Sequence, residues 1–478
     1  MKEGRQFNLR SFGSDALVYA TGQGLLLIFG CIQWLIIPKY LSVADYSYWQ
    51  FFLLYVSYVG ILHFGFIDGA HVRWAGKGLN QIGNEIKIAF RFLLFQQLVI
   101  IIPIGVLIYF LLNPPFQWIG LLVLLYAFTV NLGVFFISTA QAIRKFKLVT
   151  IVNLGKGLIF LILIAVLFSS GYVDYYHVIL VFWVAAIIAL FTLAFRFRRY
   201  LFGRRPSFTS LKIYGKDNIN IGIYILLGNF IMVLFLTIDR LMISSFFPSE
   251  QFAIYAFALT ITMAGYMFVA AISQVFFPNL SAMSTELRTK AYRLGKPAII
   301  IVWAAILAVY FPTARLIEFY LPQYTYSLPI MQILLCTVGF GSLIQILHVS
   351  YYKAYLKQRL YFLWGITSLI CSVVLNILAI TIFGTLESVA VATLISFGVW
   401  YIINELSLKA VTQEGNKDFW KSILILCSCL SAFWLTSLLV DWFVNQMLIY
   451  FGLFLLIIWL LWRSKAKELI GVVRQLRN

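Results

Sequence analysis

Residues 118–140 read WIGLLVLLYAFTVNLGVFFISTA, a run of twenty-three positions without a charged side chain. An α-helix rises about 1.5 Å per residue, so this run extends for roughly 34 Å, enough to cross the ~30 Å hydrocarbon core of a bilayer. A strand of a membrane barrel would instead alternate polar and apolar residues, and the run shows no strict alternation. It therefore predicts a transmembrane helix.

The composition of the whole chain requires the same environment. Hydrophobic residues occupy 62% of the 478 positions and charged residues 11%, whereas a soluble globular protein carries about 25% charged residues. So much apolar surface cannot be enclosed in one water-soluble core of this size. Because hydrocarbon offers the backbone no hydrogen bonds, continuous apolar runs must form helices. We predict an all-α membrane protein.

The same pattern recurs on both sides of residues 118–140 and predicts about fourteen transmembrane helices. The apolar runs lie at 15–37, 48–67, 92–112, 118–140, 148–168, 177–195, 219–243, 252–276, 297–311, 329–352, 360–383, 388–408, 419–440 and 446–462. A basic connection separates the first six from the last eight. We predict a six-helix lobe at 1–200, a cytosolic linker at 201–216, a second six-helix lobe at 217–410 around a shared central cavity, and two additional helices with a basic tail at 411–478.

Lysine and arginine are concentrated on one side of the predicted spans. If the N-terminus lies in the cytosol, 33 of the 36 basic residues fall in or near cytosolic segments, and the exceptions are Lys39, Arg240 and Arg315. The positive-inside rule expects this bias and places both termini in the cytosol. The net charge of +19 is therefore a topology signal. Anionic lipid headgroups suffice as its counter-charge, and nucleic acid is not required.

Residues that carry catalytic chemistry are sparse. The 4 histidines and 17 acidic residues show no metal-ligand spacing, and no glycine-rich phosphate loop with a following lysine occurs. All five cysteines fall within predicted spans, so neither a disulfide framework nor a zinc site is indicated. We expect no enzymatic activity, no metal and no cofactor. Uphill movement of a substrate would need an ion gradient, consumption of the substrate on the far side, or a partner.

The two halves of the chain echo one another. Residues 36–42 (IIPKYLS) end the first predicted span, residues 237–244 (TIDRLMIS) end the seventh, and aromatic residues follow both segments. Lys39 and Arg240 thus take equivalent places at the outer end of the first helix of each half. Duplicated halves of even helix number are a common plan among transporters.

Three segments of the chain resemble a known family. Residues 39–51 (KYLSVADYSYWQF) combine a cation, a short turn, an acidic residue and aromatics, and residues 239–243 (DRLMI) with 255–257 (YAF) are similar in the second half. Residues 375–378 (LNIL), 383–384 (FG) and 390–393 (AVAT) complete the pattern. In their order and spacing these segments resemble the Wzx-type polysaccharide flippases of the multidrug/oligosaccharidyl-lipid/polysaccharide exporter superfamily.

This resemblance implies translocation of a polyprenyl-pyrophosphate-linked oligosaccharide across a bacterial cytoplasmic (inner) membrane. The substrate would be assembled on the cytosolic face and destined for a surface polysaccharide such as the O-antigen of lipopolysaccharide. The implied partners are this glycan and membrane lipids, together with a polysaccharide polymerase and a chain-length regulator.

Polar and ionisable residues in or beside the spans are the candidate site residues, because they are costly in hydrocarbon. The substrate-binding candidates are Arg240, Lys39, Lys156, Asp239, Gln274 and Asn229. Snorkelling of the cations to headgroups is the alternative interpretation. The candidates for a gate or a proton relay are Asp68, Arg73, His63 and His348, which could equally form structural ion pairs and hydrogen bonds.

Amides inside the spans also have two interpretations. Examples are Gln96, Gln97 and Asn131, which fall in the third and fourth predicted helices. Amides recognise sugars together with aromatic residues, and they also link helices in membrane bundles.

Three other functions remain open. A drug/cation antiporter of the same superfamily would need a carboxylate cluster in the first half, where Asp15 and Asp68 are the only acidic candidates in the first two spans. A lipid II flippase would share the fold and differ in its cavity cations. A membrane-bound polymerase or ligase would present a large outer loop, whereas the longest outer connection, 312–328, has about seventeen residues.

Overall fold

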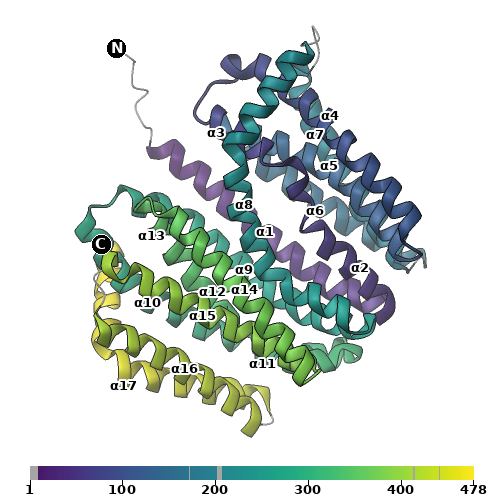
Figure 1. Ribbon diagram of the computed structural model, residues 1–478. Helices are drawn as coiled ribbons and strands as arrows, with labels where there is room; N and C mark the ends of the chain where they lie inside the picture. The colour runs from purple at the N-terminus through teal and green to yellow at the C-terminus, as the bar shows by residue number, and fades with distance from the viewer. Residues whose placement is uncertain (1–8, 172, 202–206, 413–414, 441, 478) are drawn as a thin grey trace. The chain divides into compact units, whose positions relative to one another are not determined.

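The computed structural model describes the backbone of residues 9–171, 173–201, 207–412, 415–440 and 442–477. Within these ranges it leaves out the side chains of 9–20, 410, 462–477 and nine positions between 268 and 282. Every regular element of the described chain is helical (Figure 1).

The helices of the first half are α1 (Leu9–Tyr40), α2 (Val43–Val56), η1 (Val59–His63), α3 (Phe66–Trp74), α4 (Leu79–Leu111), α5 (Phe116–Ala142), α6 (Phe146–Ser169), α7 (Tyr175–Phe197) and η2 (Arg198–Tyr200). The second half contains α8 (Phe208–Phe246), α9 (Ser249–Ala282), α10 (Thr285–Leu307), α11 (Tyr310–Tyr320), η3 (Pro322–Ser327), α12 (Leu328–Ser342), η4 (Leu343–His348), α13 (Val349–Ala354), α14 (Gln358–Ile382), α15 (Leu386–Thr412), α16 (Asn416–Leu439) and α17 (Phe443–Arg477).

All fourteen predicted apolar runs coincide with these helices, and the all-α membrane fold is confirmed. Among the described residues, twelve helices are long and apolar enough to cross a membrane, or thirteen if the bent pair in the second run is one span. The run 252–276 falls on α9, which is outside that count. The number fourteen and the cytosolic termini stay predictions.

Contacts group the chain into two compact units, Met1–Thr237 and Ile238–Asn478. Most of α8 is grouped with the first unit, and the four-part division predicted from the sequence stays a prediction.

Polar caps fix several helix starts within the units. The Ser42 hydroxyl accepts the Asp45 amide at 3.0 Å before α2, and the Asp174 carboxylate accepts the His177 amide at 2.8 Å before α7.

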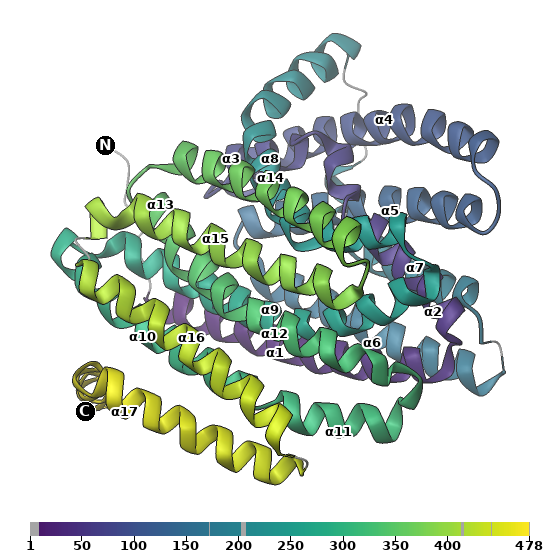
Figure 2. The same cartoon turned by 60° about the horizontal axis from the view of Figure 1, so that its bottom comes forward.

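The two units repeat one pattern of helix packing. In the first, α5 packs on α2, α4 and α7, and α6 packs on α7; in the second, α12 packs on α9, α10 and α15, and α14 packs on α15. Figure 2 shows α14 and α15 running side by side. Among the described candidate spans of each half of the chain, the fourth predicted span is the most buried, at 61% for α5 and 89% for the span containing α12. This correspondence agrees with the sequence echo between the halves.

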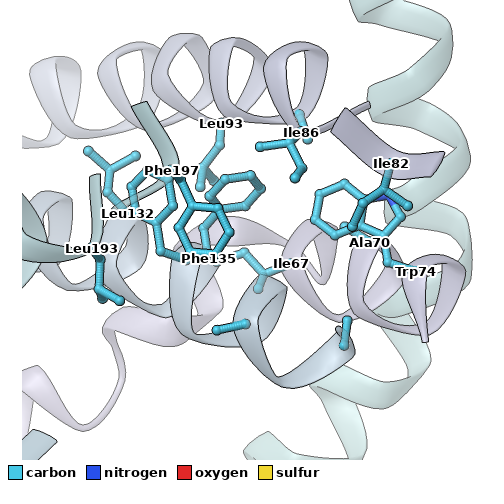
Figure 3. Close-up of a cluster of buried hydrophobic side chains, with 14 of the residues drawn as sticks. Ile67, Ala70, Trp74, Ile82, Ile86, Leu93, Leu132, Phe135, Leu193 and Phe197 are labelled. Atoms are coloured by element: carbon cyan, nitrogen blue, oxygen red, sulfur yellow. The ribbon is translucent and has the colours of Figure 1, made fainter. Parts of the chain in front are cut away.

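Apolar and aromatic side chains of α3, α4, α5, α6 and α7 form a buried cluster in the first unit (Figure 3). Trp74 of α3 meets Phe135 of α5 edge-on, with ring centroids 5.9 Å apart. Phe136 of α5 stacks on Phe197 of α7 at 5.7 Å. Rings of this size supply large contact areas with defined geometry, so this cluster fixes α3, α5 and α7 together.

The second span of the first unit is broken. Helices α2 and η1 on one side and α3 on the other meet at an angle of 60°. Two consecutive residues at the break, Phe64 and Gly65, have left-handed backbone angles with φ of 47° and 77°. A helix cannot continue through this conformation, so several backbone carbonyls around the break lose their helical partners.

Amides from neighbouring helices supply the missing hydrogen bonds. Gln97 of α4 donates to the Leu62 carbonyl at 3.0 Å, and Asn131 of α5 donates to the Val59 carbonyl at 3.2 Å. Asn131 also donates to the Gln97 side-chain oxygen at 2.9 Å. Irregular backbone at membrane depth requires such partners. These two amides therefore act as links between helices.

Just beyond the break, α3 lies against α8 with almost no side chain between them. A Cβ atom on Gly222 of α8 would fall 1.9 Å from the Gly65 carbonyl oxygen and 2.4 Å from the Gly69 nitrogen. A Cβ on Gly69 would fall 1.9 Å from the Asn218 carbonyl oxygen. All of these contacts are with backbone, which cannot rotate away. The crossing therefore requires glycine at these positions.

We predict that Gly222→Ala destabilises the protein and that Gly228→Ala does not. The first change forces two backbones apart, and overpacking of this kind costs about 1–3 kcal/mol. Gly228 lies on the same helix, and a Cβ there meets nothing within 4 Å, so alanine should be neutral or slightly stabilising. Thermal denaturation of the two purified variants in one detergent measures the difference. Equal melting temperatures would show that the crossing is loose.

Candidate functional site

Lys156 is a cation placed deep within the first unit. It lies ten residues after the start of α6, about 15 Å along the helix axis. Its Nζ donates to the hydroxyl of Tyr126, which lies ten residues after the start of α5, at 3.0 Å. Because α5 and α6 are consecutive spans that run in opposite directions, the ammonium is remote from the ends of both helices.

Aromatic rings surround this ammonium. Nζ lies 5.5 Å from the centroid of the Tyr126 ring and 5.1 Å from that of Phe182. Tyr126 and Phe182 stack at 5.1 Å, and Phe182 meets Trp49 edge-on at 5.4 Å. No carboxylate of the described residues pairs with Lys156. The cation–π contacts contribute about 0.5–2 kcal/mol, but they do not neutralise the positive charge of the ammonium.

The second unit holds Asp239 near the C-terminal end of α8. This side chain is 2% exposed, and its two oxygens have separate partners. One accepts the Arg240 amide at 2.7 Å; the other accepts the Tyr255 hydroxyl of α9 at 2.6 Å and the Thr393 hydroxyl of α15 at 3.4 Å. Asp239 thus joins α8, α9 and α15, and its oxygens are engaged within the protein.

The other substrate-binding candidates are distributed over both units. Arg240 is half-buried beside Asp239, Lys39 is exposed in the last turn of α1, and Asn229 is exposed on α8. Gln274 lies on α9, and its side chain is outside the described set. Their proposed contact with substrate stays a prediction.

The gate candidates Asp68 and Arg73 do not pair with each other. Asp68 lies 3.9 Å from Nδ1 of His63, which already accepts the Gly65 amide at 3.2 Å. That bond gives His63 a structural role at the break in the second span. Arg73 instead forms an ion pair with Asp217 of α8 at 3.8 Å and lies 5.1 Å from the Tyr214 ring centroid.

His348 belongs to a buried cluster whose other members the sequence analysis missed. Its Nε2 lies 3.0 Å from an oxygen of Glu405 on α15, and Glu405 also pairs with Lys296 of α10. Lys296 was counted among the cytosolic residues, but its side chain is 2% exposed. Glu405 could have been found, because it is the one charged residue in the predicted span 388–408.

The surroundings of Lys156 suit an anion better than a metal ion. Lys156 presents an uncompensated positive charge within an aromatic setting that also suits the apolar faces of sugars. Among the described residues, no group of three or more His, Cys, Asp or Glu side chains is placed to hold a metal ion.

The fold is shared with solved membrane transporters. Lipid II flippase MurJ in an inward closed conformation is similar at 14% identity, over 94% of this chain and 99% of that chain, with a TM-score of 0.71. A multidrug resistance MATE family transporter of the MOP superfamily, in an inward-facing conformation, is similar at 12% identity, over 84% and 99%, with a TM-score of 0.62. The protein is therefore a multi-pass membrane protein with the MurJ/MATE fold.

The family follows from the sequence. A family model described as "Polysaccharide biosynthesis protein" matches residues 12–284, more than half of the chain. The chain belongs to this family, and the resemblance stated from the sequence is confirmed. No curated protein matches the sequence.

We predict that Lys156→Met stabilises the protein by about 1 kcal/mol, because a lysine within a span costs ~2.5–3.5 kcal/mol and its aromatic contacts return ~0.5–2. Methionine keeps the apolar length of the side chain. Thermal denaturation of the purified protein measures the change, and Lys147→Met, at an exposed position near the start of the same helix, should leave stability unaltered. A lower melting temperature for Lys156→Met would assign this lysine to packing.

Proposed function

We propose that the protein translocates a polyprenyl-pyrophosphate-linked oligosaccharide from the cytosolic to the outer leaflet of a bacterial cytoplasmic membrane, for surface polysaccharide biosynthesis. The chain works by alternating access, so that its binding groups face each side of the membrane in turn, without nucleotide hydrolysis. The polyprenyl tail stays in lipid, and the glycan and pyrophosphate pass through the protein.

The family and the fold support this proposal together. Membership of the polysaccharide biosynthesis family ties the chain to glycan assembly, and the MurJ/MATE fold is one that moves substrates across membranes. The sequence has no glycine-rich phosphate loop that would bind a nucleotide. Transport is therefore more consistent with these features than polymerisation or ligation.

The observation that carries the proposal is the uncompensated charge of Lys156. A charge-assisted hydrogen bond contributes roughly 1.5–3 kcal/mol, which repays much of the cost of keeping a lysine within a span. A pyrophosphate that crosses the membrane needs such a fixed cation at depth. A neutral or cationic substrate would gain nothing from it.

A lipid II flippase is the second candidate, favoured by the similarity to MurJ over 94% of this chain. Both substrates carry a polyprenyl pyrophosphate and differ in the glycan. Deletion of the gene separates them: loss of a surface polysaccharide with intact cell-wall synthesis supports the first function, and arrested cell-wall synthesis supports the second.

We predict that Arg240→Ala lowers the surface polysaccharide by about 10–100-fold in a complemented deletion strain. The arginine is half-buried at the outer part of α8, and loss of one charge-assisted contact of 1.5–3 kcal/mol corresponds to that factor. Arg240→Lys should retain part of the activity, because the charge remains and the planar fork is lost.

Arg315→Ala is the matched control for this experiment. Arg315 is also a predicted outer-side arginine, but it is 47% exposed and pairs with Glu318 at 2.7 Å. Exposed pairs of this kind contribute about 0–1 kcal/mol, so transport should be nearly normal. Membrane protein must be quantified in each strain. Full polysaccharide with Arg240→Ala at normal abundance would make Arg240 an interface anchor.

A further inference from the structure

Three elements of the second unit bring opposite charges together away from solvent. Lys296 of α10, His348 at the end of η4 and Glu405 of α15 have side chains that are 2%, 0% and 2% exposed. Lys296 pairs with one oxygen of Glu405, the Tyr292 hydroxyl donates to the same oxygen at 2.7 Å, and Nε2 of His348 lies 3.0 Å from the other oxygen. An ionised carboxylate accepts all three.

The hydrogen bond to Glu405 defines the state of His348. An ionised carboxylate only accepts, so Nε2 of the histidine carries the hydrogen. In the neutral ring, Nδ1 then holds a lone pair, and it is a buried nitrogen without a hydrogen-bond partner. The ring is held in place by Tyr401, which stacks on it with centroids 5.5 Å apart. His348 therefore presents one ring nitrogen whose lone pair has no hydrogen-bond partner.

The surroundings of His348 contain few other titratable groups. Besides Glu405 and Lys296, the neighbours are Tyr292 of α10, Tyr401 of α15 and two residues of α13: Tyr351, whose ring lies 4.9 Å from that of Tyr292, and Tyr352, which lies within electrostatic range of Glu405. Lys353 of α13 is exposed. Helix α12 has Cys336 as its one titratable residue, and α9 has Glu250, in its first turn, as its one charged residue. Hence Glu405 is the anion that responds to a charge on His348.

The helix geometry and the depth also set this cluster apart. His348 ends a π-helical turn, Leu343–His348, and such turns are rare and occur frequently at functional sites. Lys296 lies eleven residues from the start of α10, and Glu405 seven residues from the end of α15. The predicted topology puts both ends in the cytosol. The cluster thus lies about two to three turns from these helix ends, at the cytosolic side of the predicted spans.

We propose that His348, Glu405 and Lys296 form a proton-binding site, and that its occupancy couples a proton gradient to the translocation proposed above. A hydronium ion gives its proton to the Nδ1 lone pair, so that its O–H bond breaks as the N–H bond forms and an imidazolium ion results; on release the proton passes back to water. Before uptake the lysine and glutamate charges cancel. After uptake Glu405 is shared between two cations, which weakens its bond to Lys296 and so loosens α10 from α15.

A purely structural clasp is the competing explanation. A buried lysine–glutamate pair already satisfies its own charges, and replacing such pairs by apolar residues is often neutral or stabilising. The clasp needs only a hydrogen-bond donor at position 348, which glutamine supplies. The two explanations therefore differ in whether His348 changes its protonation state.

Histidine NMR tests proton binding independently of transport. The chain has only 4 histidines, so protein labelled at histidine ring carbons in lipid nanodiscs gives few signals, and the signal missing in His348→Phe is that of His348. We expect the chemical shift of this signal to change when the pH is varied between about 5 and 9, because the ring binds one proton. Its midpoint should change in Lys296→Met and stay fixed in Lys357→Met, an exposed control. A constant chemical shift over this range overturns the proton site.

Vesicles containing a pH-sensitive dye test the coupling, with undecaprenyl pyrophosphate as the probe. In the wild type the proton flux should accompany lipid movement, and the rate should change with pH by up to about tenfold per unit, the limit for one linked proton. His348→Gln should move lipid at a rate independent of pH, without proton flux. Unchanged proton flux in this variant overturns the coupling. A wild type that moves no lipid overturns the proposed function and with it the coupling, while the NMR titration still decides the proton site.

Discussion

Backbone hydrogen bonding in hydrocarbon is the constraint on which the rest of this structure depends. Each amide and carbonyl must find a partner inside the protein, and unbroken helices achieve this locally. The second span departs from that solution at Phe64 and Gly65. Gln97 and Asn131 donate hydrogen bonds to carbonyls at this break. The positions of α4 and α5, which carry these two amides, are therefore constrained by the break. The glycine crossing with α8 begins at the same break.

Charge in the same apolar environment is held in three different ways. Asp239 has its oxygens satisfied by three helices, and Glu405 is neutralised by Lys296. Lys156 has aromatic rings and a hydroxyl group but no anion. The first two arrangements satisfy their charges within the protein. The third carries a cost in the absence of a negatively charged substrate, and for this reason we propose Lys156 as a substrate-binding group.

Local sequence was sufficient for the helices, because an uncharged run of about twenty residues has few alternatives in lipid. It also identified Lys156 as a candidate, because a single cation within a long apolar run can be recognised without knowledge of its neighbours in the fold. The break in the second span was not predicted, because phenylalanine gives no signal for a left-handed conformation. The cluster around Glu405 was missed for another reason: Lys296 lies 109 residues away, and only packing of α10 on α15 brings the two together.

The most direct measurement of the central claim is leaflet exchange of a fluorescent polyprenyl-pyrophosphate-linked oligosaccharide in sealed vesicles. An impermeant quencher reports the label in the outer leaflet alone. With the purified protein and no nucleotide, the account predicts that quenching proceeds to the inner-leaflet label as well, and that Lys156→Met slows this second phase by about 10–100-fold, the factor for one charge-assisted contact. Quenching that stops at the outer-leaflet fraction, equally with and without the wild-type protein, would contradict it.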